Sequence, residues 1–268
     1  PKESPQSGIY KTTNGGKTWK PLTKGLPNFA EGKCERVGLD ICRTQPNTVY
    51  AVINSNGAYI YRSDDKGETW KPIEGNDKIK GEFPGYGWVF GQVRVDPADP
   101  NMIYIMGLGF QRSRDGGKTW ERLRGTHVDY HGMWIDPTDS KHLLVCNDGG
   151  IMISRDDFAT HHHPANIPIG QMFNADVTQT AGRFYIYSNL QDHGSWRGKV
   201  DLSAGRDKIA WSQWENAPGD ESGRHAVDPT DPNLVYGTTR YGGGPYKADY
   251  WDLDPSSNRI RSKPISPN

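Results

Sequence analysis

The sequence lacks several features that mark common classes of protein. Its 268 residues include three cysteines, Cys34, Cys42 and Cys146. An odd number without regular spacing is not a disulfide framework. Cys34 and Cys42 fall near one predicted strand, where the extended residues between them hold the two sulfurs apart, so buried or free thiols are favoured.

Net charge is also absent, because 32 Lys and Arg balance 32 Asp and Glu. Binding to nucleic acid or an anionic membrane needs a basic face, so neither is expected as the main partner. No apolar run is long enough for a membrane span, and no signal peptide is visible. Because the chain opens inside a repeat, we expect it to be one part of a larger chain or assembly.

Repetition is what the sequence has in abundance. One motif, Ser/Thr-x-Asp/Asn-x-Gly-x-Thr-Trp, recurs at intervals of about 50 residues. Its copies are "TTNGGKTW" (12–19), "SDDKGETW" (63–70) and "SRDGGKTW" (113–120). A degenerate copy, "SRDDFATH" (154–161), has Phe158 for the glycine and His161 for the tryptophan.

A second pattern precedes these boxes and reads as strand, Asp-Pro turn, strand. Its Val, Ile and Tyr flanks favour strands, and Asp and Pro favour the turn. The copies are "VRVDPADPNMIYIMGLG" from Val93, "MWIDPTDSKHLLVCNDGG" from Met133, "HAVDPTDPNLVYGTTRYGG" from His225 and a weaker "LDICRTQPNTVYAVIN" from Leu39. A further unit from Phe173 has the same rhythm with "TAG" as its turn.

Together the patterns predict an all-β fold, a β-propeller of four-stranded antiparallel blades with the box as the turn between the third and fourth strands. At least five blade units are expected, over approximately 8–24 (partial), 36–74, 92–124, 131–170, 173–215 and 224–268. Residues 1–268 then form a single propeller, closed by a composite blade from the two ends, or a piece of a larger propeller. The C-terminal tail "SNRIRSKPISPN" favours the second alternative, a piece of a larger propeller.

The box itself is expected to be structural. The Ser/Thr hydroxyl and the Asp carboxylate can bond nearby backbone N–H groups, the glycine permits positive φ, and the Trp can pack between blades. One carboxylate per turn is too few for a Ca²⁺ site. Function is therefore expected at residues that break the repeat.

These motifs resemble Asp boxes, also called BNR repeats, which occur in sialidases, xyloglucanases, sortilin-type receptors and photosystem II assembly factors. The strings "HVDYHGMWIDPTDSKHLLVCNDGG", "SNLQDHGSWRG" and "GDESGRHAVDPTDPNLVYGTTRYGG" resemble large secreted bacterial proteins of the sortilin-like or glycosyl-hydrolase BNR-repeat type. The resemblance covers most of the chain. It implies carbohydrate or partner binding, and an extracellular or periplasmic location. A sialidase is disfavoured because three arginines cannot be placed on inner strands.

The first candidate site is "THVDYHGMW". His127, Asp129 and His131 alternate just before a predicted inner strand, so in an extended segment they point to one face. Such a face can hold a divalent metal or perform acid–base chemistry. A polar rim is the alternative interpretation. Asn147 and Asp148 of "CNDGG" are expected to form a turn.

Two further candidates combine carboxylates with aromatic residues. In "LQDHGSW" the polar side chains and the Trp suit a sugar, or form a turn with a packing Trp. Its candidate ligand-binding residues are Gln191, Asp192, His193 and Trp196. Asp220 and Glu221 of "GDES" precede an inner strand and are candidate catalytic carboxylates with Asp129, or a solvated loop.

Arg240, Tyr241 and Trp88 are further candidate ligand-binding residues. We expect His127, Asp129, His131, Asp192 and Asp220 to share a site at the central channel. Two functions remain open. One is a carbohydrate-binding or glycoside hydrolase-like propeller acting on a polysaccharide. The other is a non-enzymatic, sortilin-like module that binds a protein or peptide.

Overall fold

The computed structural model describes residues 7–30, 34, 36–54, 59–83, 89–164, 170–178, 183–203, 205–208, 214–221 and 223–239, and the backbone of 246–254 and 259–264. The chain divides into two compact units, unit 1 (Pro1–Ala165) and unit 2 (Asn166–Asn268). In the described residues no helix is long and apolar enough to cross a membrane.

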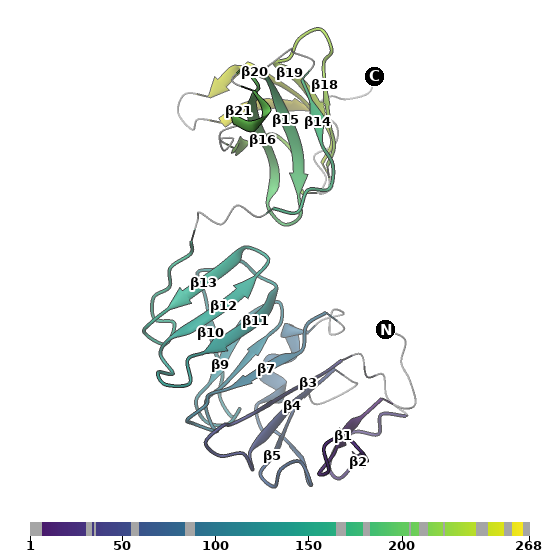
Figure 1. Ribbon diagram of the computed structural model, residues 1–268, viewed down its shortest axis with the longest axis vertical. Helices are drawn as coiled ribbons and strands as arrows, with labels where there is room; N and C mark the ends of the chain where they lie inside the picture. Colours follow the sequence, from purple (N-terminus) through teal and green to yellow (C-terminus); the bar gives the residue numbers. More distant parts are fainter. Residues whose placement is uncertain are drawn as a thin grey trace. The chain divides into compact units, whose positions relative to one another are not determined.

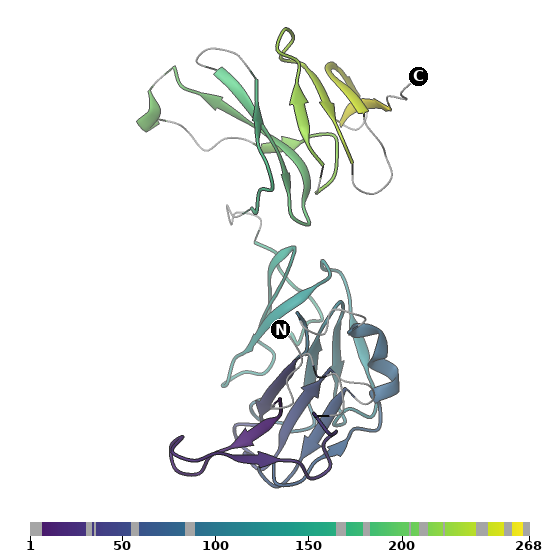
Figure 2. The ribbon, with the colours of Figure 1, turned by 90° about the vertical axis from the view of Figure 1, so that its right-hand side faces the viewer.

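Unit 1 is built of antiparallel sheets (Figure 1). Its strands are β1 (Ile9–Lys11), β2 (Lys20–Leu22), β3 (Val37–Ile41), β4 (Val49–Ile53), β5 (Ile60–Ser63), β6 (Lys71–Pro72), β7 (Gln92–Val95), β8 (Ile103–Met106), β9 (Phe110–Ser113), β10 (Glu121–Leu123), β11 (Tyr130–Ile135), β12 (Leu143–Asn147) and β13 (Gly150–Ser154). They form the sheets β1-β2, β3-β4-β5-β6, β7-β8-β9-β10 and β11-β12-β13, each in chain order. A 3-10 helix, η1 (Asn76–Glu82), follows β6 and is the coiled blue ribbon in Figure 2.

Unit 2 has two four-stranded antiparallel sheets among its described residues, again in chain order. The first contains β14 (Asp176–Val177), β15 (Arg183–Leu190), β16 (Gly194–Asp201) and β17 (Trp214–Asn216), with η2 (Arg206–Lys208) between the last two. The second contains β18 (His225–Val227), β19 (Leu234–Gly237), β20 (Tyr246–Asp254) and β21 (Arg259–Pro264). The predicted all-β fold of antiparallel β-propeller blades is confirmed.

The sheet β11-β12-β13 differs from the four-stranded pattern. Where a fourth strand is expected, the described residues form a single bridge between Ile153 and His162. Pro164 follows at once, and a proline cannot donate to a sheet ladder. The degenerate box therefore leads into a segment that does not extend the sheet.

Each box is a turn closed by its own side chains. In the third box the Ser113 hydroxyl accepts from Gly117 N–H at 2.8 Å, and Asp115 accepts from Thr119 N–H at 2.9 Å and the Thr119 hydroxyl at 2.6 Å. The second box repeats these bonds, and the degenerate box keeps them with Phe158 N–H in place of the glycine. The predicted structural role follows from this geometry.

The box tryptophan packs on the preceding sheet. Trp70 is 3% exposed and lies in one apolar cluster with Ile9 and Leu22 of the sheet β1-β2. Its backbone N–H donates to Lys24 O at 3.0 Å, and a Cβ added to Gly25 would lie 1.9 Å from Trp70 O. Only a glycine allows this approach.

A glycine also contacts the following box at the next two boundaries, through different atoms. Gly75 N–H donates to Gly117 O at 2.9 Å, and a Cβ on Gly75 would lie 2.3 Å from that oxygen and 3.0 Å from Trp120 Nε1. At the third boundary His161 Nε2 donates to Gly125 O at 3.0 Å. We call Gly25, Gly75 and Gly125 the seat glycines. Trp19 of the first box, in contrast, is 59% exposed.

The inner strands are also tied to one another within each unit. In four cases a side chain of one inner strand bonds the backbone of the next. Asp40 Oδ2 accepts from Val95 N–H, and Asp176 Oδ2 accepts from Val227 N–H. Gln92 Nε2 donates to His131 O, and Arg94 Nε donates to Met133 O. These bonds connect neighbouring sheets within each unit.

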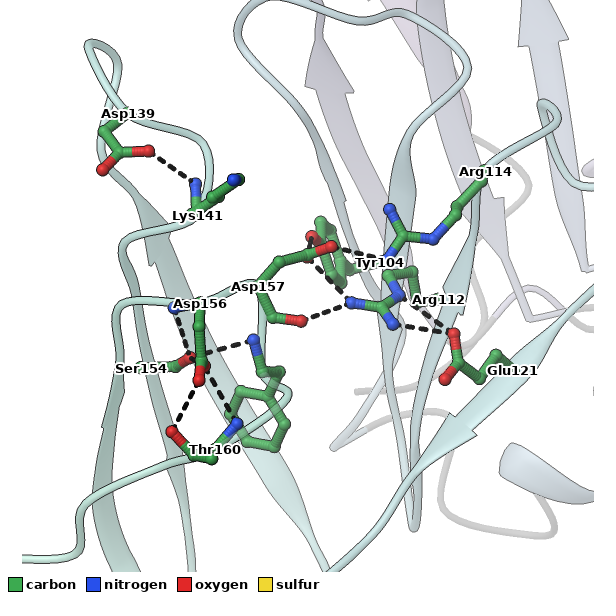
Figure 3. Close-up of polar contacts among 11 residues, drawn as sticks. Tyr104, Arg112, Arg114, Glu121, Asp139, Lys141, Ser154, Asp156, Asp157 and Thr160 are labelled. Carbon is green, nitrogen blue, oxygen red and sulfur yellow. Dashed lines mark hydrogen bonds and ion pairs between the residues drawn. The ribbon is translucent and has the colours of Figure 1, made fainter.

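The degenerate box carries an additional polar lock (Figure 3). Asp157 and Phe158 both have positive φ, where the third box has two glycines, and such a conformation is uncommon for other residues. The Asp157 carboxylate accepts from the Tyr104 hydroxyl at 3.0 Å and pairs with Arg112 at 2.8 Å and Arg114 at 2.5 Å. These bonds to the preceding sheet offset the backbone strain.

Replacement of a seat glycine tests the docking contact. Gly75 has φ of −92°, so Gly75→Ala introduces no backbone strain and pushes Cβ into Gly117 O and Lys118 O. We expect a loss of about 1–3 kcal/mol in the free energy of unfolding, measured with urea. Gly81→Ala is the control, since nothing lies within 4 Å of its added Cβ. Equal stability of the two variants would show that the contact between Gly75 and Gly117 O does not require a glycine.

The box carboxylates predict a pH dependence. Hydrogen bonds from Thr69 hold the pKa of Asp65 at about 2, below its ordinary value near 4. The stability this adds is present above about pH 4 and is lost as pH falls through about 2. We therefore expect Asp65→Asn to be less stable than the native chain at pH 7, with the difference closing near pH 2.

The first box provides the reciprocal control, because Asn14 stands where the other boxes have Asp and bonds Thr18. Asn14→Asp is expected to gain stability at neutral pH and to lose that gain in acid. Chemical unfolding at several pH values measures both variants. Parallel pH profiles for Asp65→Asn and the native chain would refute the assignment.

Candidate functional site

The segment that contains His127, Asp129 and His131 is not extended. Asp129 has φ of 64°, β11 begins only at Tyr130, and the register shifts between Tyr130 and Gly132. The expected alternation onto one face is therefore wrong for this segment, because a left-handed residue interrupts it. Among the described residues, no group of three or more His, Cys, Asp and Glu side chains is arranged to hold a metal ion.

His131 instead pairs with Asp148. Its Nε2 donates to Asp148 Oδ1 at 2.7 Å, and both side chains are partly exposed. Asp148 N–H donates to Asp129 O at 3.1 Å. The Asn147 amide donates to His127 O at 2.6 Å. The segments "THVDYHGMW" and "CNDGG", which are separate in the sequence, therefore contact each other.

A carboxylate bonded to one imidazole nitrogen orients the ring and leaves the other nitrogen directed elsewhere. The ring centroid of Phe90 lies 5.4 Å from that of His131. The hairpin between β12 and β13 has no room for a side chain at Gly149, since a Cβ there would lie 2.4 Å from the His127 Cβ. The pair can hydrogen-bond a polar ligand at the start of β11.

In unit 2 the structure brings two predicted groups together. Asp192 N–H donates to Glu221 Oε2 at 2.9 Å, and the Gln191 amide donates to Asp192 Oδ2 at 2.9 Å. Asp192 has φ of 58°, as the tight β15–β16 hairpin requires. We call Gln191, Asp192 and Glu221 the hairpin cluster. It presents carboxylate and amide groups from two loops.

A buried amide holds this arrangement. Asn189 is 0% exposed, and its Nδ2 donates to Asp220 O at 2.5 Å and to Ser195 Oγ at 2.6 Å. The Ser195 hydroxyl also donates to Asp220 O, at 3.2 Å. Asn189 thereby fixes the backbone immediately before Glu221, although its own side chain does not reach solvent.

Trp196 and His193 belong to the same hairpin. Trp196 Nε1 donates to His193 O at 2.5 Å, three residues back, as Trp70 Nε1 does to Gly67 O in the second box. The Trp196 side chain is half-buried, and His193 is exposed. The indole therefore closes the hairpin, and His193 faces solvent beside the hairpin cluster.

A buried histidine, His225, bonds the backbone of the loop that contains Asp220. His225 Nε2 donates to Pro218 O at 3.0 Å, and the ring packs 5.6 Å from that of Tyr187. Burial lowers the pKa of His225 below its ordinary value. A neutral imidazole is therefore favoured at physiological pH, which suits a structural role in the loop.

Arg240, Tyr241 and Trp88 lie outside the described residues. His127, Asp129 and His131 belong to unit 1, whereas Asp192 and Asp220 belong to unit 2. The shared channel site for these five residues therefore stays a prediction, as does a catalytic pair of Asp129 and Asp220.

Sequence reasoning missed three residues that organise these sites. Asp148 is expected only as part of a turn, and neither Asn189 nor His225 breaks the repeat visibly. A signal was present for one of them, because "LLVCN" and "IYSN" both place an Asn, Asn147 or Asn189, at the end of a second strand. Both amides bond a loop that leads into an inner strand.

Comparison with known proteins agrees with this architecture. A family model for the BNR/Asp-box repeat matches residues 111–122, which include the third box. A xyloglucanase from Paenibacillus sp is 26% identical over 269 residues, covering 93% of this chain and 23% of that protein. A xyloglucanase from Hypocrea jecorina is 32% identical over 152 residues, covering 50% and 17%.

The chain thus spans about a quarter or less of the length of these curated relatives. Among solved structures, the GH74 xyloglucanase from Xanthomonas campestris is 16% identical, with 92% of this chain and 42% of that chain covered. The TM-score is 0.45, and a likeness of this size carries no argument about function.

The boxes, the blade sheets and the family match define an Asp-box β-propeller repeat protein. Within this class the chain contains a BNR/Asp-box repeat and is similar over most of its length to a xyloglucanase. The resemblance seen in the sequence is confirmed.

The role of Asn189 can be tested by removing its amide. Asn189→Ala leaves Asp220 O with one fewer donor in a buried site, which costs about 1–3 kcal/mol of stability. We expect faster hydrogen exchange in residues 217–224 than in the native chain. Asn233→Ala is the matched control, since its amide makes one local bond of 3.4 Å to Asp231. Unchanged exchange in Asn189→Ala would remove the assigned role.

Proposed function

We propose that this chain is a polysaccharide-binding portion of a carbohydrate-active β-propeller, with xyloglucan as the ligand. The observation that carries the proposal is the similarity to a xyloglucanase over 93% of the chain. Because that match covers 23% of the relative, the relative's complete activity is not assigned to this chain. An extracellular or periplasmic location is part of the proposal, since a cell-wall polymer is met outside the cytoplasm.

The hairpin cluster supports this function chemically. A sugar hydroxyl both donates and accepts, and it is recognised by carboxylates and amides placed side by side. Gln191 and Asp192 at the β15–β16 hairpin, with Glu221 of the loop before β18, offer both kinds of partner. His193 stands exposed on the same hairpin.

The position of these groups also suits a ligand site. The Asp220–Glu221 loop leads into β18, and His131 lies at the start of β11, so both precede or open an inner strand. In a propeller the inner strands surround the central channel, where ligands commonly bind. A location at the channel mouth is therefore part of the proposal for each unit. Arg240, Tyr241 and Trp88 remain candidate ligand contacts.

Hydrolysis is a further step of the proposal. Glycoside cleavage needs two carboxyl groups, about 5–5.5 Å apart for retention or about 6.5–9.5 Å for inversion. Asp129, Asp220 and Glu221 are the candidate carboxyl groups. A chain that binds without cleaving would contain the binding residues alone.

A glycan array with the purified chain tests the function directly. We expect binding to xyloglucan fragments and about tenfold weaker binding by Glu221→Gln, which removes the charge and keeps the shape of the side chain. Asp201→Asn is the matched control, because Asp201 lies at the far end of β16 and pairs with Arg183. Release of reducing ends from the polymer reports hydrolysis.

Three outcomes would contradict parts of the proposal. Absence of binding to every glycan, together with capture of a peptide ligand, would favour the non-enzymatic propeller module. Equal weakening by Asp201→Asn would show that the hairpin cluster is not the site. Binding without release of reducing ends would remove hydrolysis from this chain.

A further inference from the structure

A short segment of unit 2 runs beside the hairpin cluster. Gln191 N–H donates to Gln171 O and Phe173 N–H donates to Asn189 O, both at 2.9 Å, with a bridge between Met172 and Leu190. Residues 171–173 therefore lie antiparallel to the end of β15. This pairing holds the backbone of Phe173 directly opposite the buried Asn189.

The next residue ties the same segment to the second loop of the site. Asn174 Nδ2 donates to Gly223 O at 2.9 Å, and the Ser188 hydroxyl donates to Asn174 O at 2.7 Å. Phe173 thus lies between a bond to β15 and a bond to the loop that carries Glu221. Both anchors belong to the elements that form the hairpin cluster.

Despite this fixed backbone, the side chains of the segment face solvent. Phe173 is 49% exposed and Met172 is 47% exposed. Folding normally removes a side chain as apolar as Phe from water, so an exposed ring on a pinned backbone is a feature that a ligand can use. The backbone at Gly170 is close-packed, since a Cβ there would lie 2.7 Å from Leu190 Cδ2.

We propose that Phe173 is the aromatic platform of the unit 2 site, on which a pyranose ring stacks while Glu221, Asp192 and Gln191 bond its hydroxyls. This inference rests on the proposed function and names a contact residue for it. A sugar ring has an apolar face of C–H groups and an edge of hydroxyls, which matches a ring beside carboxylates and an amide.

The polar partners favour a neutral sugar over a basic peptide. A lysine or arginine requires acceptors alone, whereas the amide of Gln191 supplies donors beside the Asp192 carboxylate. Glu221 already accepts the Asp192 N–H, which offsets part of its charge. A hydroxyl finds both of its partners here.

The test compares three variants by calorimetric titration with a xyloglucan oligosaccharide. Phe173→Ala is expected to raise the dissociation constant about tenfold, because the stacking surface is lost. Phe173→Trp retains an aromatic face and is expected to bind within about threefold of the native chain. Tyr236→Ala is the matched control, an exposed aromatic of the same unit on β19, and is expected to bind as the native chain does.

The outcomes separate this inference from the proposed function. If the native chain binds and Glu221→Gln weakens binding while Phe173→Ala does not, the platform is wrong and the function stands. If the native chain binds no oligosaccharide, both fail. If Phe173→Ala loses binding to a lysine-rich peptide instead, the ligand class is wrong. Matching thermal unfolding of the variants confirms that each result reports on binding.

Discussion

The sheets of unit 1 depend on one constraint, the close packing of each box against a glycine that follows the preceding sheet. At Gly25 and Gly75 the added Cβ would meet a backbone oxygen, so the sheets approach each other as closely as peptide groups allow. The box turn is rigid because its Asp carboxylate accepts several hydrogen bonds. A rigid turn packed against a glycine backbone fixes the distance between neighbouring sheets. The remaining core side chains fill the space between them.

The degenerate box shows how this contact survives a change of sequence. His161 replaces the tryptophan and donates to Gly125 O, while its ring lies 5.0 Å from that of Phe158. Phe158 joins the apolar core that is shared with Phe110, at a centroid distance of 5.2 Å. The ion pairs of Asp157 supply the remaining connection. The boundary therefore exchanges one large aromatic contact for several smaller ones.

The candidate sites rest on the same framework, because the loops at the strand ends are held by amides at the ends of second strands. Asn147 bonds the loop before β11, and Asn189 bonds the loop before β18. The sequence indicated which loops break the repeat, including Gln191, Asp192 and Glu221. It did not indicate that Asp192 N–H meets Glu221, since Asp192 falls in the predicted unit 173–215 and Glu221 lies in the connector between that unit and the next.

The sequence by itself determined the all-β propeller architecture, because turn chemistry and strand-forming runs are local and recur at a constant period. It also determined that each box is structural, since the bonding groups lie within a few residues. Only the tertiary structure decided the pairing of His131 with Asp148, the left-handed turn at Asp129 and the position of Phe173 beside the hairpin cluster. Such contacts depend on how separate loops meet, and no local pattern encodes that geometry.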